Sequence, residues 1–537
     1  MSIIPDGSPP SIPPVSKSIL SRGLTNGFSS IRRGSRKEHP RGVSKPRVGD
    51  VRNDNSGGFP ILQRSDIFIA VSAQPASINS LTDALLKAIF WEIFPHLDEA
   101  ALEVTEPVAV VLTSQSHPRR VSERLMLVSH RWQRIILDNS EFWSLVLLHF
   151  RYPSSLKKEN LEMQLQRSGD MPIDIFIRHR QPTEPIQDDT LRLLRGHLTR
   201  IRCISGLLTP QDLGMLFPPG STWEMSKLQI FNARDLPPLS TDFLMGPLSA
   251  PQLVYLALPA SELAFRFISP IPYEKLIYLY ITSNRAEIPC SQFLDILRLG
   301  PNLRSLVFLN HCPDAYQDES WPTTKITLLY LNDLSLSFAY NNDSFYFLRS
   351  LYCPNLKRIR CTESRGPYPP TETGPTEIFW HISLEFAETL EDIVIAPDTF
   401  AVGINVMEPL VRRLENLTTL YITSVPLHSD FFEIFLPNEG GPYDKWCCPR
   451  LRTLSLAKLD IEGDALVRVI RVRSHPDEGE PKESEKPLYK GLHSHLQSVT
   501  VESCCFLQDS VYELLLQLER SYSKVIKVFT RQLHFRR

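Results

Sequence analysis

The chain has 537 residues, of which 42% are hydrophobic and 9% aromatic, a composition typical of several folded domains or of one elongated repeat array. Its 58 basic and 60 acidic residues leave a formal net charge of −2, which excludes a strong overall attraction to nucleic acid or to an anionic membrane. No stretch reaches the ~18 apolar residues of a transmembrane helix, and we expect no secretion signal. The nine cysteines are scattered, so we expect reduced thiols and a cytoplasmic or nuclear protein.

Residues 1–76 are rich in Pro, Ser, Gly and Arg and show no apolar periodicity, which predicts a disordered arm. Between Lys17 and Arg47 every charged residue is basic except Glu38. Such basic runs can act as nuclear-import or polyanion-binding arms. They are more often solvated tails, and we favour that interpretation.

Two amphipathic stretches predict a small helical domain at residues 77–150, with an inserted surface loop at 98–122 that contains Pro107 and Pro118. In the second stretch the apolar residues recur on one face of a single helix. The two tryptophans and branched apolar residues of this stretch offer more apolar surface than so small a unit can bury alone. The apolar face comprises Leu125, Val128, Trp132, Ile135 and Ile136.

The two stretches resemble the two halves of an F-box, in the form found in F-box-like proteins of basidiomycete fungi. Residues 81–90 are similar to the opening Leu-Pro-x-Glu-Leu-Leu-x-x-Ile-Phe, with Thr82 in place of the proline and Ala84 in place of the glutamate. Residues 125–143 are similar to the Leu-x-x-Val-(Cys/Ser)-(Arg/His)-x-Trp helix and the tryptophan that follows it. The resemblance implies binding to a Skp-type adaptor of a cullin–RING ubiquitin ligase. The adaptor-binding residues that it implies are Leu81, Leu85, Leu86, Ile89, Phe90, Leu125, Val128, Trp132, Ile135 and Trp143.

The sequence of residues 151–195 predicts a helix and a strand that connect the helical domain to the rest of the chain. Leu161 and Leu165 lie one helical turn apart, and Gly169 can end that helix in a left-handed conformation. Apolar residues then alternate from Ile173 to Ile177, as in a strand. The same joint follows the F-box in the fungal family that this chain resembles.

Residues 196–537 contain a recurring Leu-x-x-Leu-x-Leu pattern, in which other apolar residues also occur, mostly at intervals of about 23 to 34 residues. Each copy predicts a short strand followed by a helix-like return, and only stacked copies can bury the apolar faces. We therefore predict an α/β fold with an irregular leucine-rich-repeat solenoid; a plain α/β domain with buried strands is the alternative. The copies begin at Leu198, Leu253, Leu276, Leu303, Leu331, Leu356, Leu390, Leu417, Leu451 and Leu496, with a weaker copy at Leu228.

The sequence shows no phosphate-binding glycine loop, nucleophile elbow or metalloprotease motif, so we expect no enzymatic activity, no cofactor and no metal. The nearest metal-like group is His493 and His495 with Cys504 and Cys505, and its spacing fits no standard zinc module.

The resemblance and the repeats together predict the substrate-recognition subunit of an SCF-type ubiquitin ligase, with an unknown target protein bound by the repeats. We expect neither membrane nor specific nucleic acid as a partner. One alternative is a repeat scaffold without a ligase role, whose F-box-like helices cap the solenoid. Such a cap would bury Leu85, Ile89 and Trp132 against the first repeats, whereas an adaptor-binding unit would leave part of that face exposed. The other is a metal- or nucleic-acid-dependent protein that uses the His/Cys group or the basic arm.

Overall fold

The computed structural model describes a subset of the chain, which includes neither the basic arm nor the His493 and His495 pair. Contacts divide the chain into two compact units, Met1–Pro75 and Ala76–Arg537, and every described residue belongs to the second. The described residues are 78–94, 118–149, 158–178, 186–233, 247–259, 271–282, 290–309, 325–338, 347–363, 381–396, 410–424, 429–436, 447–461, 464–474, 496–506, 509–521 and 526–529.

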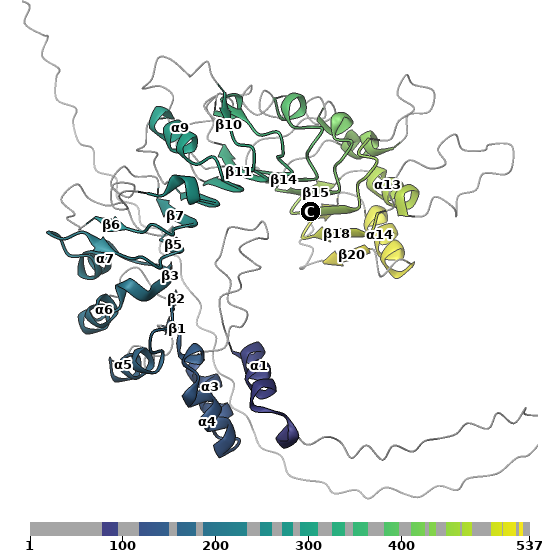
Figure 1. Ribbon diagram of the computed structural model, residues 1–537. Helices are drawn as coiled ribbons and strands as arrows, with labels where there is room; N and C mark the ends of the chain where they lie inside the picture. Colours follow the sequence, from purple (N-terminus) through teal and green to yellow (C-terminus); the bar gives the residue numbers. More distant parts are fainter. Residues whose placement is uncertain are drawn as a thin grey trace, which may run out of the picture. The chain divides into compact units, whose positions relative to one another are not determined.

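A parallel sheet of 14 strands runs through the described residues, and its strands lie side by side in chain order (Figure 1). Parallel neighbours require a return segment between them, so the chain passes from strand to strand by repeated crossovers. The fold is therefore mixed α/β, as the sequence predicts. The strands are β1 (Leu145–His149), β2 (Ile173–Arg178), β3 (Ile201–Gly206), β5 (Ile230–Asn232), β7 (Tyr255–Pro259), β8 (Tyr278–Thr282), β9 (Ser305–Leu309), β11 (Asp333–Phe338), β13 (Arg358–Glu363), β14 (Asp392–Ala396), β15 (Thr419–Thr423), β16 (Thr453–Ala457), β18 (Ser498–Glu502) and β20 (Ile526–Phe529).

Each predicted copy of the apolar pattern supplies one strand from β3 to β18, and the weaker copy at Leu228 supplies β5. The first leucine of a copy precedes the strand, and in the copies from Leu253 onward the next two apolar residues of the pattern lie on the strand and are buried in the same core cluster. In one copy Leu331, Leu334 and Leu336 are all buried. The sheet is longer than the predicted array, because it begins with β1 and β2, before residue 196.

Helices cover one face of this sheet, and their apolar sides join the strands in a buried cluster that extends from Val146 to Ile526 (Figure 1). The helix-like returns that the repeat pattern predicts are present between several strands, and residues 347–349, 381–385 and 410–413 are helical as well. The helices on this face are α5 (Lys158–Arg167), α6 (Asp188–Arg195), α7 (Pro210–Leu216), α9 (Cys290–Leu299), α13 (Ala465–Ser474) and α14 (Asp509–Ser521), and the 3₁₀ helices η4 (Leu198–Arg200), η5 (Tyr273–Lys275) and η7 (Ser429–Phe435) also lie in the returns.

Several returns also contain a short extended segment, and the returns that hold β4, β17 and β19 contain a helix as well. These short segments pair with one another in three parallel ladders. That pairing satisfies their backbone groups beside the main sheet. The ladders are β4 (Trp223–Glu224) with β6 (Leu248–Ser249), β10 (Ile326–Thr327) with β12 (Leu351–Tyr352), and β17 (Asp460–Ile461) with β19 (Cys505–Phe506).

Asparagine side chains link successive copies at the turns that precede the strands, a feature that the sequence analysis missed. Asn302, Asn355 and Asn416 each stand directly before the first leucine of a copy. Each side-chain amide donates a hydrogen bond to a backbone carbonyl about one copy earlier, which ties neighbouring turns together. The acceptors are Glu274 (2.6 Å), Leu329 (2.8 Å) and Glu388 (2.6 Å).

A small helical unit precedes the sheet, and it differs from the prediction in two places. The expected single helix over residues 125–136 is broken at Ser129, whose hydroxyl accepts a hydrogen bond from the Trp132 amide and caps a new helix. The loop expected at 98–122 ends earlier, because a helix already begins at Pro118; residues 98–117 lie outside the described residues. The unit comprises η1 (Ile78–Ser80), α1 (Asp83–Ile93), α3 (Pro118–Met126), α4 (His130–Asp138) and η2 (Ser140–Trp143).

Candidate functional site

The helical unit has an apolar core of its own, separate from the core of the sheet. Phe90 and Trp132 lie at its centre, with ring centroids 4.7 Å apart. Several of the predicted adaptor-binding residues are therefore buried inside the unit. The buried members of the predicted set are Leu86, Phe90, Trp132, Ile135 and Trp143.

Other predicted residues lie at the surface of the same unit. Leu85 is 53% exposed and Ile89 is 40% exposed, and Ile93, which was not predicted, is 46% exposed. These three residues are spaced four apart on α1, so they form one stripe on the helix, here called the α1 ridge. Val128 is exposed in the turn between α3 and α4, while Leu81 and Leu125 are half-buried.

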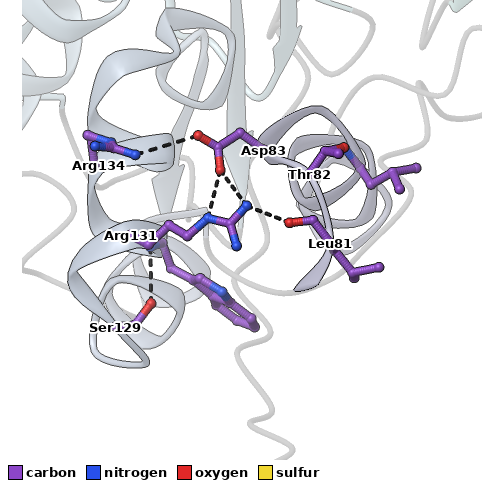
Figure 2. Close-up of polar contacts among 8 residues, drawn as sticks. Leu81, Thr82, Asp83, Ser129, Arg131 and Arg134 are labelled. Atoms are coloured by element: carbon purple, nitrogen blue, oxygen red, sulfur yellow. Dashed lines mark hydrogen bonds and ion pairs between the residues drawn. The ribbon is translucent and has the colours of Figure 1, made fainter. Parts of the chain in front are cut away.

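Arg131 holds the two halves of the unit together (Figure 2). Its Nε donates to Asp83 Oδ1 at 2.7 Å, and its Nη2 donates to the Leu81 carbonyl at 2.5 Å. The first turn of α4 therefore lies against the start of α1. This link was not predicted from the sequence, because Arg131 and Asp83 lie 48 residues apart and an ion pair leaves no periodic pattern.

Thr82, which stands where the fungal family has proline, caps α1. Its hydroxyl accepts a hydrogen bond from the Leu85 amide at 3.3 Å, and its backbone is extended (Figure 2). Threonine is a favoured N-cap residue, so the helix begins at the same place without the proline. The departure from the family pattern is thus accommodated locally.

The helical unit joins the sheet through Trp143. Its indole N–H donates to the Ile136 carbonyl at 2.9 Å, and the Arg167 guanidinium of α5 lies 4.5 Å from the ring centroid. The next residue, Ser144, accepts a hydrogen bond from the Asp174 amide at 3.0 Å, and β1 then begins. Trp143 therefore packs at the junction between the helices and the first strands.

The face of the sheet opposite the helices changes character along the strands. From β1 to β9 it carries a second buried apolar cluster, which includes Phe176, Tyr255 and Tyr280. From β11 to β18 the matching positions are polar or small and mostly half-buried, and we call them the polar strand face. Its residues are Asp333, Ser335, Arg358, Arg360, Asp392, Val394, Thr419, Tyr421, Thr453, Ser455, Ser498 and Thr500.

A charged group lies at the start of the polar strand face. Arg358 Nε lies 3.2 Å from Asp333 Oδ1 and 3.3 Å from Asp392 Oδ2, so the guanidinium bridges two carboxylates. Asp333 is nevertheless buried, and burial raises its pKa to about 6. Arg358 lowers this pKa, Asp392 raises it and Arg360 lowers it, so desolvation outweighs the neighbouring cations.

Asp333 should make the stability of the sheet depend on pH. Its folded-state pKa lies above the ordinary 3.8, so between about pH 4 and 6 the folded chain holds a proton that the unfolded chain has released. The resulting stabilisation is fully present below about pH 4 and lost as the pH rises through about 6. Relative to Asp333→Asn, the free energy of unfolding of the parent should rise by about 1–3 kcal/mol from pH 7 to pH 4.

Chemical denaturation across this pH range measures the effect. Ser335→Ala, on the same face of β11, is the non-titrating control and should differ from the parent by a constant amount at every pH. A pH-independent difference between the parent and Asp333→Asn would contradict the assignment.

Two further properties concern the described residues alone. None of their helices combines the length and the apolar content that crossing a bilayer requires. They also bring together no group of three or more His, Cys, Asp or Glu side chains suited to holding a metal ion.

No protein-family model matches this chain, and none of the curated proteins matches it.

Proposed function

We propose that the chain is the substrate receptor of an SCF-type cullin–RING ubiquitin ligase, acting in the cytoplasm or nucleus. In this proposal the helical unit is an F-box that binds a Skp-type adaptor, and the long sheet is an irregular leucine-rich-repeat solenoid that binds a target protein. The receptor performs no covalent step. It raises the effective concentration of the target near the ligase.

The observation that carries the proposal is the α1 ridge. The helical unit buries one side of α1 in its own core, yet Leu85, Ile89 and Ile93 on another side remain about half exposed. Single exposed apolar residues are common, but a stripe along one helix marks a surface that a partner can cover. Leu85 and Ile89 of the ridge lie within the stretch that resembles the first half of an F-box, where the family places its adaptor contact, and Ile93 extends the ridge by one turn.

A helical cap without a ligase role is the second candidate, and the junction favours it in part. The helix α3 contacts β1, the first strand of the sheet, as a cap would. A cap, however, was expected to bury Leu85 and Ile89 against the first repeats, and both are exposed. Trp132 is buried, but in the core of the helical unit. The helical unit thus contacts β1 through α3, while the α1 ridge stays exposed and can bind a partner.

The full chain and its Leu85→Asp/Ile89→Asp double variant should be compared for binding to a purified Skp-type adaptor. The parent should bind, and two aspartates on the ridge should weaken binding at least about 100-fold, because they would place unpaired charges in an apolar contact. Leu299→Asp/Leu329→Asp is the matched control, since both leucines are about half exposed but lie in the sheet region. Failure of the folded parent to bind, or equal binding by the ridge variant, would reject the adaptor role.

A further inference from the structure

Basic residues are concentrated in the segment that contains the turn between α3 and α4. Residues 118–134, which form α3, the turn and the first part of α4, contain five arginines and one glutamate, a net charge of +4. The whole chain has a net charge of −2, so this segment is a local exception. By contrast, α1 carries one basic and two acidic residues: Lys87, Asp83 and Glu92.

The turn between α3 and α4 carries the most exposed large apolar side chain of the described residues. Leu127 is 86% exposed and Val128 is 57% exposed, both in the turn between α3 and α4. Arg124 lies exposed one turn before Leu127, in the last turn of α3. The turn is therefore an apolar tip that directly follows the exposed Arg124.

Contacts already described place this turn beside the α1 ridge. Arg131 fixes the start of α4 against Leu81 and Asp83, and Leu85 follows one turn later on α1. Arg134 Nη2 lies 3.6 Å from Asp83 Oδ2, with the Arg134 side chain 65% exposed. A single aspartate thus faces two guanidinium groups, and positive charge remains at this end of the surface.

We propose that the α3–α4 turn is a second contact of the same interface and selects a protein partner whose apolar groove has an acidic rim. Leu127 and Val128 enter the groove, while Arg124 and Arg134 face the carboxylates of the rim. This inference rests on the proposed adaptor function and names the chemistry of the partner. Complementary charge at the rim of an interface acts mainly on the association rate and its dependence on salt.

The test measures the association and dissociation rates of the full chain with the Skp-type adaptor at about 50 mM and about 500 mM NaCl, where screening differs strongly. The association rate should fall about tenfold at high salt. Arg124→Gln/Arg134→Gln should lower the association rate several-fold at low salt and leave the dissociation rate nearly unchanged. Arg124→Lys/Arg134→Lys should keep the parent rate, because the positive charge remains.

Arg192→Gln/Arg349→Gln is the matched control, since both arginines are exposed and lie outside the helical unit. Adaptor binding with a salt-independent association rate, unchanged in the Gln variant, would overturn this inference and leave the adaptor function standing. No adaptor binding by the folded parent would overturn both. Binding to phosphatidylserine vesicles that Leu127→Glu abolishes would reassign the turn to a membrane surface and overturn the inference as well.

Discussion

Replacing Phe90 by alanine is expected to open the helical unit, with a loss of about 3–5 kcal/mol in its local stability. Phe90 is fully buried, and its ring packs 4.7 Å from the Trp132 ring, measured between centroids. The substitution removes a large apolar surface and leaves a cavity between α1 and α4. The unit has few other apolar contacts to compensate, because its core is small.

Hydrogen exchange of the α4 amides measures this local opening without requiring the whole sheet to unfold. Leu85→Ala is the matched control on the same helix. Leu85 is half exposed, so its replacement should change the opening free energy by less than about 0.5 kcal/mol. Equal effects of the two substitutions would show that Leu85 contributes to the core as much as Phe90 does. The description of the α1 ridge as a free surface would then be wrong.

The strands could be predicted well because their signal is repeated and local. Each copy places apolar residues at the same spacing, and the copies from Leu253 to Leu496 all became buried strands. β20 carries only part of the pattern: Ile526 and Val528 pair with Val499 and Val501 of β18, but Ser523 stands where the first leucine would be. Parallel pairing is a long-range property, so a short irregular strand at the end of an array carries little local signal.

In the helical unit, the periodic spacing of apolar residues led to a wrong prediction of one continuous helix. Leu125, Val128 and Trp132 fit one helical face, yet Val128 is exposed in a turn and Trp132 is buried in the next helix. The helix is interrupted because Ser129 caps α4. A single capping residue does not alter the spacing of the apolar residues over several turns, so the spacing alone does not indicate the interruption. The same limit explains why Phe90 and Leu85 were predicted to share a function: periodicity marks apolar residues, but only packing decides which of them is covered.

Replacing Arg473 is the second substitution for which we expect a large loss of stability. Arg473 is fully buried in the last turn of α13, and its guanidinium donates hydrogen bonds to three backbone carbonyls in the return between β15 and β16. The acceptors are Phe435 (3.4 Å), Cys448 (3.0 Å) and Cys447. Burial lowers the pKa of Arg473, although the Cys448 and Cys447 thiols act in the opposite direction. The side chain thus fastens α13 to η7 and to the turn before β16.

Arg473→Met should cost about 3 kcal/mol in the local stability of α13. Methionine fills much of the space but removes the guanidinium donors from the Phe435 and Cys447 carbonyls, at roughly 1–3 kcal/mol each. The Cys448 carbonyl still accepts from the Leu451 amide, and removal of the desolvated charge offsets part of the loss. Hydrogen exchange of the α13 amides measures the cost. Arg471→Met, exposed on the same helix, should change it by less than about 0.5 kcal/mol.

Arg473→Lys separates charge from hydrogen-bond geometry. Lysine keeps the positive charge, but its shorter, compact ammonium cannot reproduce the planar fork of donors that reaches three carbonyls. It would leave carbonyls unsatisfied while still burying a charge, so Arg473→Lys should be no more stable than Arg473→Met. Full rescue by lysine would mean that the charge alone matters. The hydrogen bonds to the Phe435, Cys447 and Cys448 carbonyls would then not be what joins α13 to the neighbouring copies.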